Sequence, residues 1–193
     1  GWCGSHTCVT VAAAALCQFA GRDHALGHIR GAQLPDGSWI GYWWCDRAYT
    51  TALAIAALMH STESSDRKRI EHAITWITDY VRAHTNGQST TETDRPFVLA
   101  WCIRALMQAP EGRTKRQHLE MAVRHLLATQ QSDGSWCSSA RLRIPPPHVT
   151  DPENYQGWVQ DGRGGGSIQL DVYRSFTTAT VLVALHEAEQ ELE

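Results

Sequence analysis

A seven-residue pattern that occurs twice constrains the fold of this chain more than any other feature. The pattern Gln-x-x-Asp-Gly-Ser-Trp spans residues 33–39 and again residues 130–136. Each copy is later followed by an aromatic-Thr-Thr-Ala sequence, at 49–52 and at 176–179, that opens an apolar, alanine-rich stretch. Repeats of this kind are typical of arrays in which each structural unit packs against the next. We therefore predict an array of helical hairpins.

Two more apolar stretches complete the array. Residues 7–16 and 97–106 align position for position with residues 49–58. Longer amphipathic segments, apolar on one helical face and charged on the others, lie between the apolar stretches. We expect four enclosed inner helices and three outer helices, and we interpret residues 184–193 as a fraying helix end. The predicted outer helices are 23–33, 65–83 and 113–130.

Composition limits the partners and the compartment. The chain of 193 residues is 42% hydrophobic and 19% charged, which suits a globular domain with one core. A net charge of −3 and the absence of a dense basic run argue against a nucleic-acid partner. No secretory leader or membrane-spanning apolar stretch is recognised. The six cysteines lie mostly inside or beside predicted helices, so we expect a cytoplasmic, reduced protein.

The repeats resemble those of the terpene cyclase and protein prenyltransferase superfamily. Squalene-hopene and oxidosqualene cyclases carry a Gln-to-Gly-x-Trp repeat that residues 33–39 and 130–136 match. The resemblance implies an all-α fold, an α/α toroid, in which the Trp packs near a helix start and the Gln ties hairpins together. We interpret residues 1–193 as a single toroid domain of roughly four hairpins, with a long loop insertion at 137–171. We expect it to be a fragment, an open partial ring or half of an assembly.

Charged residues recur just before the predicted inner helices. Asp46-Arg47 and Asp94-Arg95 each precede an aromatic residue, and Arg174 stands at the corresponding place in the last repeat. Because parallel inner helices present their starts on one side of a ring, we expect these groups to meet at one mouth. A structural interpretation stays open, in which each Asp caps its helix, stabilising it by about 0.5–2 kcal/mol, or pairs with an Arg of a neighbouring hairpin.

The segment Glu92-Thr93-Asp94-Arg95 resembles the Asp-x-Asp-Asp motif with which class II terpene cyclases protonate an alkene or epoxide. The resemblance implies that Asp94 is the acid, that Glu92 and Arg95 adjust its acidity, and that Asp46 is a second polar group. Such an acid must be neutral before reaction, and an apolar pocket favours the neutral form. Arg95 departs from the motif, since a nearby cation favours the ionised carboxylate.

Aromatic residues near the inner helix starts are candidates for substrate binding. Ring faces stabilise carbocations over their negative quadrupole, and large rings also brace a fold without binding anything. In the insertion, Arg141 and Arg143 are candidates to meet an anionic group such as a diphosphate. The candidate substrate-binding residues are Trp43, Trp44, Tyr49, Phe97, Trp101 and Phe176, with Arg174 at the same rim.

We expect no metal and no cofactor. Residues 46–49 and 171–174 resemble two zinc-binding segments of protein prenyltransferases, but Ala48 and Arg174 stand where that family has Cys and His. Neither replacement can hold zinc.

The cysteines near the start of the chain leave two interpretations open. Cys3, His6 and Cys8 are residue types that bind zinc, but a closed site needs a fourth ligand. The alternative is that they are structural. Cys17 and Cys102 lie in apolar stretches and are predicted to be core thiols.

Two functional hypotheses from different classes follow. The first is a terpene cyclase-like enzyme that binds a long apolar isoprenoid or polyene substrate and promotes its acid-catalysed cyclisation. The second is a non-catalytic binding or assembly module that keeps the cyclase fold, within a larger biosynthetic protein. The expected partner is an apolar small molecule. Peripheral membrane contact, a homo-oligomer and a complementary half of the ring are further candidates.

Overall fold

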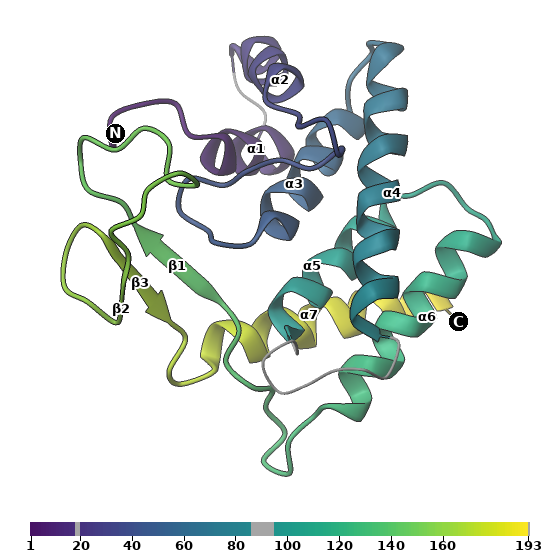
Figure 1. Ribbon diagram of the computed structural model, residues 1–193. Coiled ribbons are helices and arrows are strands. Elements are labelled where there is room, and N and C mark those ends of the chain that lie inside the picture. Colours follow the sequence, from purple (N-terminus) through teal and green to yellow (C-terminus); the bar gives the residue numbers. More distant parts are fainter. Residues whose placement is uncertain (18–19, 86–94, 193) are drawn as a thin grey trace.

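The computed structural model describes residues 1–17, 20–85 and 95–192 (Figure 1). These ranges contain seven helices and a three-stranded sheet. The inner helices are α1 (Thr7–Leu16), α3 (Arg47–Met59), α5 (Pro96–Met107) and α7 (Ser175–Leu192). The outer helices are α2 (Arg22–Gly31), α4 (Ser65–Thr85) and α6 (Arg113–Ala128). The predicted all-α architecture, with its alternation of inner and outer helices, is confirmed.

The inner helices pack on one another in chain order. Helix α1 contacts α3, α3 contacts α5, and α5 contacts α7, as Figure 1 shows. Helix α5 is buried over most of its surface, and Leu99, Cys102, Ile103 and Leu106 are at most 1% exposed. Small alanine side chains let such helices approach closely, while their larger apolar residues fill the space between the inner and outer layers.

The outer helices have one buried face and one solvent-exposed face. In α4 the buried residues Ile70, Ala73, Ile77 and Val81 recur at spacings of three and four, so that they lie on one face of the helix. This face packs against α3 and α5, and α4 also contacts α6. The side chain of Arg67, in the first turn of α4, is 82% exposed. The amphipathic pattern therefore places α4 as the sequence predicts.

The two repeat motifs adopt the same structure. The indole nitrogen of Trp39 donates a hydrogen bond to the carbonyl of Ile29 at 2.6 Å, and that of Trp136 donates to the carbonyl of Leu126 at 2.7 Å. Both rings are at most 1% exposed. Each indole therefore closes the end of the preceding outer helix, where backbone carbonyls lack helical partners.

The turn inside the motif requires its glycine. Gly37 has a φ of +92°, and a Cβ there would lie 2.6 Å from the carbonyl oxygen of His72 on α4. The side-chain amide of Gln33 donates to the carbonyls of Gly37 at 3.1 Å and Arg69 at 2.9 Å. Gln33 thus joins its own turn to the next outer helix, in agreement with the linking role that the resemblance implies.

The insertion is more ordered than the predicted loop. It contains β1 (Arg141–Ile144), β2 (Val159–Gln160) and β3 (Ser167–Leu170), arranged in the order β1-β3-β2. Strand β3 pairs antiparallel with β1 and parallel with β2. Glycine and proline punctuation led to the expectation of a loop, but short strands form because β1 and β3 supply backbone partners for each other.

Arg143 of β1 fastens this sheet to the segment before α3. Its Nε donates to the carbonyl of Tyr42 at 3.1 Å and its Nη1 donates to Glu153 at 2.8 Å, while its Nη2 donates to the carbonyl of Gly41. The residue is only 5% exposed. The expectation that Arg143 meets an anionic ligand is therefore wrong, because its donors are already bound by the protein.

The two terminal inner helices each have one inner neighbour and carry exposed apolar side chains. Val9 and Leu16 of α1 are 54% and 75% exposed, and Leu182 and Val183 of α7 are 52% and 47% exposed. The end of α7 is helical to Leu192 and makes ion pairs through Glu187 and Glu191, so the expectation of a fraying end is wrong there. In the described part of the chain, no helix combines the length and the hydropathy needed to span a membrane.

Candidate functional site

Four of the predicted substrate-binding residues form one connected group of rings. Trp44 lies 5.1 Å from Phe97 and 5.3 Å from Tyr49, measured between ring centroids. Trp101 lies edge-on to Tyr49 at 4.8 Å and to Phe97 at 6.4 Å. We call Trp44, Tyr49, Phe97 and Trp101 the aromatic wall. It brings together residues from α3, α5 and the segment before α3, as the sequence predicts.

Helical spacing extends the aromatic wall along α5. Phe97, Trp101, Arg104 and Gln108 follow one another at intervals of four, three and four residues, so they share one face of that helix. The opposite face carries the buried residues that meet the outer helices. This face of α5 is therefore aromatic toward the start of the helix and polar toward its end.

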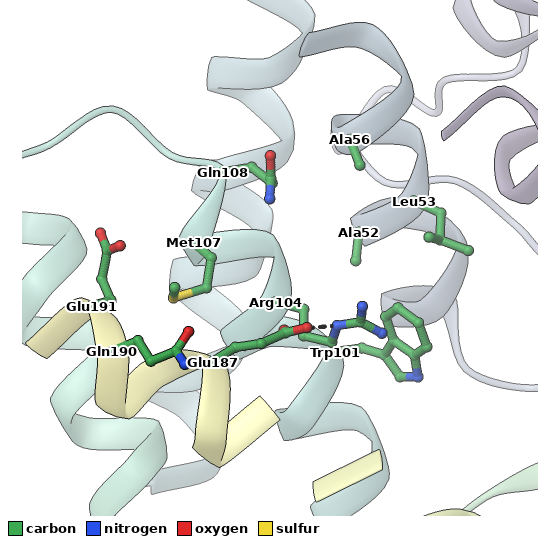
Figure 2. A pocket seen from close by; sticks show the side chains of 10 residues that line it. All are labelled: Ala52, Leu53, Ala56, Trp101, Arg104, Met107, Gln108, Glu187, Gln190 and Glu191. Atoms are coloured by element: carbon green, nitrogen blue, oxygen red, sulfur yellow. Dashed lines mark hydrogen bonds and ion pairs between the residues drawn. The ribbon is translucent and has the colours of Figure 1, made fainter. Parts of the chain in front are cut away.

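A pocket of about 330 Å³ lies between α3, α5 and α7, and Figure 2 shows its lining. We call it the inner pocket. Trp101 belongs both to this pocket and to the aromatic wall, so the two surfaces are continuous. The lining residues are Ala52, Leu53, Ala56, Trp101, Arg104, Met107, Gln108, Glu187, Gln190 and Glu191.

An ion pair inside this pocket was missed by the sequence analysis. Nε of Arg104 donates to Glu187 Oε2 at 3.0 Å, and the guanidinium carbon lies 4.6 Å from the centroid of the Trp101 ring. In Figure 2 the guanidinium lies between the carboxylate and the indole. The available signal was a single arginine in an otherwise apolar helix, three residues after a tryptophan.

Asp46 is the centre of a second group of polar side chains, at the start of α3. Its Oδ1 accepts hydrogen bonds from Arg95 at 2.8 Å and from Arg141 at 3.3 Å. Its side chain is 9% exposed, and its Oδ2 has no hydrogen-bond partner within the described residues. Asp46 makes no side-chain capping bond. Of the two structural interpretations, capping is therefore wrong for Asp46, and pairing with the Arg of a neighbouring hairpin is confirmed.

Tyr80 of α4 completes this group, which we call the polar mouth: Asp46, Tyr80, Arg95 and Arg141. The Tyr80 hydroxyl is buried without a hydrogen-bond partner in the described ranges. Burial raises the pKa of the Tyr80 phenol, and the negative charge of Asp46 adds to that effect. Burial likewise raises the pKa of the Cys102 thiol, again with a contribution from Asp46. Both groups stay neutral near pH 7.

Other predicted site residues are not brought to this place. Trp43 belongs to a different group of rings, 4.9 Å from Tyr42 and 6.1 Å from Trp2. Phe176 is 67% exposed on α7. Arg174 pairs with Asp133 of the second repeat motif at 3.0 Å, which gives it a bracing contact.

The proposed acid segment cannot be placed by this geometry. Glu92 and Asp94 lie outside the described residues, whereas Arg95, which follows them directly, is part of the polar mouth.

The N-terminal cysteines make no metal cluster. Across residues 1–17, 20–85 and 95–192, no group of three potential ligands is close enough to hold a metal ion. Cys8 is buried and its sulfur accepts a hydrogen bond from the backbone of Tyr42, whereas Cys3 is exposed. Cys102 is buried as predicted, but Cys17 is exposed because it follows the last residue of α1. The prediction of a core thiol is wrong for Cys17.

Comparison with known proteins identifies the family. Residues 15–143 match the squalene-hopene cyclase C-terminal domain, and the chain therefore belongs to that family. Its fold is similar to that of the type II terpene cyclase MstE from Scytonema, with a TM-score of 0.87 and 37% identity over 98% of this chain. A variant of MstE has been solved in complex with its substrate, geranylgeranyl dihydroxybenzoate.

Two proteins that are similar in sequence are also cyclases by name. Lanosterol synthase erg7A from Aspergillus fumigatus is 26% identical over 61% of this chain, and squalene–hopene cyclase from Bradyrhizobium diazoefficiens is 27% identical over 58%. The chain spans 17% and 18% of the length of these two proteins and 56% of MstE. It corresponds to part of each.

Proposed function

We propose that this domain is part of a class II terpene cyclase that binds a long isoprenoid or polyene chain and promotes its acid-catalysed cyclisation. The observation that carries this proposal is the aromatic wall, which continues into the inner pocket through Trp101. The substrate complex of MstE supports it, because the ligand of that similar protein carries a geranylgeranyl chain.

The aromatic wall suits a reaction that passes through cations. Trp44 and Tyr49 are half-buried, and Phe97 and Trp101 are almost fully buried, so the rings lie in a protein environment with little water. Aromatic faces attract positive charge without reacting with it. Exclusion of water also protects a reactive intermediate from premature capture. We assign substrate contact to Trp44, Tyr49, Phe97 and Trp101.

For the acid we keep the assignment that the sequence motif favours. Asp94 donates the proton, Glu92 and Arg95 adjust its acidity, and Asp46 acts through Arg95. The hydrogen bond between Arg95 and Asp46 supports this arrangement, because a guanidinium whose charge is shared with one carboxylate stabilises the ionised form of a second carboxylate less. Asp46 is thus a positioning residue in this scheme, and Asp94 is the group that touches the substrate.

The test is incubation of the native protein with isoprenoid diphosphates and with squalene-like polyenes, followed by mass spectrometry. Cyclisation gives isomeric products of unchanged mass. Asp94→Asn is expected to abolish turnover and to leave the far-ultraviolet circular dichroism unchanged. Asp79→Asn, at an exposed site on α4, is the matched control and is expected to keep activity. Turnover that survives Asp94→Asn would remove the acid assignment.

A second candidate function is a binding or assembly module without catalysis. It is favoured by the polar mouth, where two arginines already neutralise Asp46. Exposed apolar residues on α1 and α7 also suit contact with a membrane surface, a second copy or a complementary half of the ring. Saturable binding of prenyl compounds without any isomeric product would support this function over the enzyme.

A further inference from the structure

The inner pocket contains a charged pair, Arg104 and Glu187, with which a pure hydrocarbon ligand could form no hydrogen bond. The side chains of Arg104 and Glu187 are 32% and 37% exposed, and both line the pocket beside Ala52, Leu53 and Met107. A structural role as a link between α5 and α7 accounts for one hydrogen bond, from Nε of Arg104 to Glu187 at 3.0 Å. It does not account for the rest of the guanidinium.

Arg104 retains donors that the described residues do not use. A guanidinium carries five N–H donors, and a carboxylate pairs with it most strongly through two parallel bonds. Here Arg104 donates to Glu187 through Nε alone, and the ring of Trp101 covers one face of the guanidinium, with its centroid 4.6 Å from the guanidinium carbon. Figure 2 shows the group beside the Trp101 ring, with the Glu187 carboxylate on its other side. The two terminal amino groups are therefore oriented by the pair and the ring while remaining free to donate.

The charges that line the pocket determine which kind of ligand group can accept a hydrogen bond from Arg104. Glu187 neutralises Arg104, whereas Glu191 shares the single positive charge of Lys115 on α6 with Glu111, so carboxylates outnumber cations around the pocket. An anionic ligand group at Arg104 would stand close to the carboxylate of Glu187, and like charges repel strongly where water is partly excluded. An uncharged oxygen, such as a hydroxyl or a carbonyl, accepts from Arg104 without displacing Glu187.

We propose that Arg104 binds an uncharged oxygen-bearing group of the ligand in the inner pocket. This inference rests on the proposed function for the hydrocarbon part of the ligand and makes it more specific. From Arg95 to Arg104 the helix rises by about 14 Å. The ligand is then a prenyl chain whose hydrocarbon part lies along the aromatic wall and whose oxygen function lies at the end remote from the polar mouth.

The test compares three probes by calorimetric titration of the native protein: geranylgeraniol, geranylgeranyl diphosphate and the hydrocarbon with the same prenyl skeleton. We expect geranylgeraniol to bind more tightly than the hydrocarbon. Arg104→Leu is expected to weaken binding of the alcohol by about tenfold and to leave the affinity for the hydrocarbon unchanged. Arg67→Leu, at a site on α4 that is 82% exposed, is the matched control and is expected to change neither.

A second variant tests whether Glu187 is what disfavours a charged ligand. Glu187→Gln removes the repulsion and is expected to increase binding of the diphosphate while leaving that of geranylgeraniol nearly unchanged. If Arg104→Leu weakened binding of the alcohol and of the hydrocarbon equally, the inference would be overturned and the proposed function would stand. Tighter binding of the diphosphate than of the alcohol by the native protein would overturn the uncharged assignment. Failure of all three probes to bind would overturn the inference and the proposed function together.

Discussion

Arg95 and Asp46 connect the starts of two neighbouring inner helices. Nη1 of Arg95 lies 2.8 Å from Oδ1 of Asp46, and the same oxygen accepts a second hydrogen bond from Arg141 of β1. One carboxylate thus joins α3, α5 and the sheet of the insertion. The side chain of Asp46 is 9% exposed, while each arginine is more than a third exposed, so the pair is partly shielded from water.

Asp46→Ala is expected to destabilise the fold by about 2 kcal/mol, because it leaves two arginines without their shared partner at a shielded site. The free energy of unfolding in urea is the measurement. Asp79→Ala is the control, since Asp79 pairs with Arg82 at the surface of α4 and is 61% exposed. That change is expected to cost less than about 1 kcal/mol. Equal losses in the two variants would show that the polar mouth does not link the helices.

Asp66 makes stability depend on pH. It is 2% exposed and accepts three hydrogen bonds from Arg30: from Nε at 2.9 Å to Oδ1 and 3.1 Å to Oδ2, and from Nη2 at 2.8 Å to Oδ2. Burial by itself raises the pKa of Asp66, but the hydrogen bonds from Arg30 and Ser61 outweigh it, so the pKa lies below its ordinary value of 3.8. A depressed pKa means that the folded state holds the proton less tightly than the unfolded state. The resulting stability is fully present above the unfolded pKa and is lost as the pH falls through the folded pKa.

The corresponding variant is Asp66→Asn. It is expected to cost about 3 kcal/mol at pH 7, because it leaves Arg30 without its buried partner. The gap in unfolding free energy between the native protein and this variant is expected to shrink as the pH falls below about 4. Urea unfolding at several pH values between neutrality and pH 3 is the measurement. Glu71→Gln, exposed on the same helix, is the control, and a gap that stays constant with pH would contradict the assignment.

Local sequence patterns predicted most of the fold, because the repeats report contacts close in sequence. Trp39 bonds a carbonyl ten residues away, and its motif recurs intact in the second copy. Arg104 and Glu187 are 83 residues apart, and no periodicity indicates that they meet. The strands of the insertion depend in the same way on pairing between distant segments. The aromatic wall also joins distant residues, such as Trp44 and Phe97, but it was predictable because its rings lie near the starts of aligned inner helices. Its polar continuation has no such signal, because it is set by packing of the whole array.

Cysteine reactivity is expected to follow burial. Cys102 is fully buried in α5, and burial raises the pKa of its thiol, so the reactive thiolate is scarce at pH 8. Cys3 and Cys17 are exposed. With a water-soluble alkylating reagent and peptide mass spectrometry, Cys3 and Cys17 should be labelled in the native protein, and Cys102 only after unfolding in urea. Rapid native labelling of Cys102 would mean that α5 is accessible to solvent.

The equivalence of the two repeat motifs predicts matched effects of matched substitutions. Trp39→Phe and Trp136→Phe each remove an indole donor from a buried carbonyl, that of Ile29 or of Leu126. Each carbonyl is then left with longer hydrogen bonds of 3.3 Å, from the backbone of Ala32 or from Thr129. Each substitution is expected to lower the free energy of unfolding by about 1–3 kcal/mol. Trp158→Phe in the insertion is the control, since Trp158 is only half-buried, and it should cost less than either. Because the two motifs brace different hairpins, the double substitution is expected to show nearly additive losses. A large cost at one motif and none at the other would mean that the repeats share a sequence without sharing a structural role.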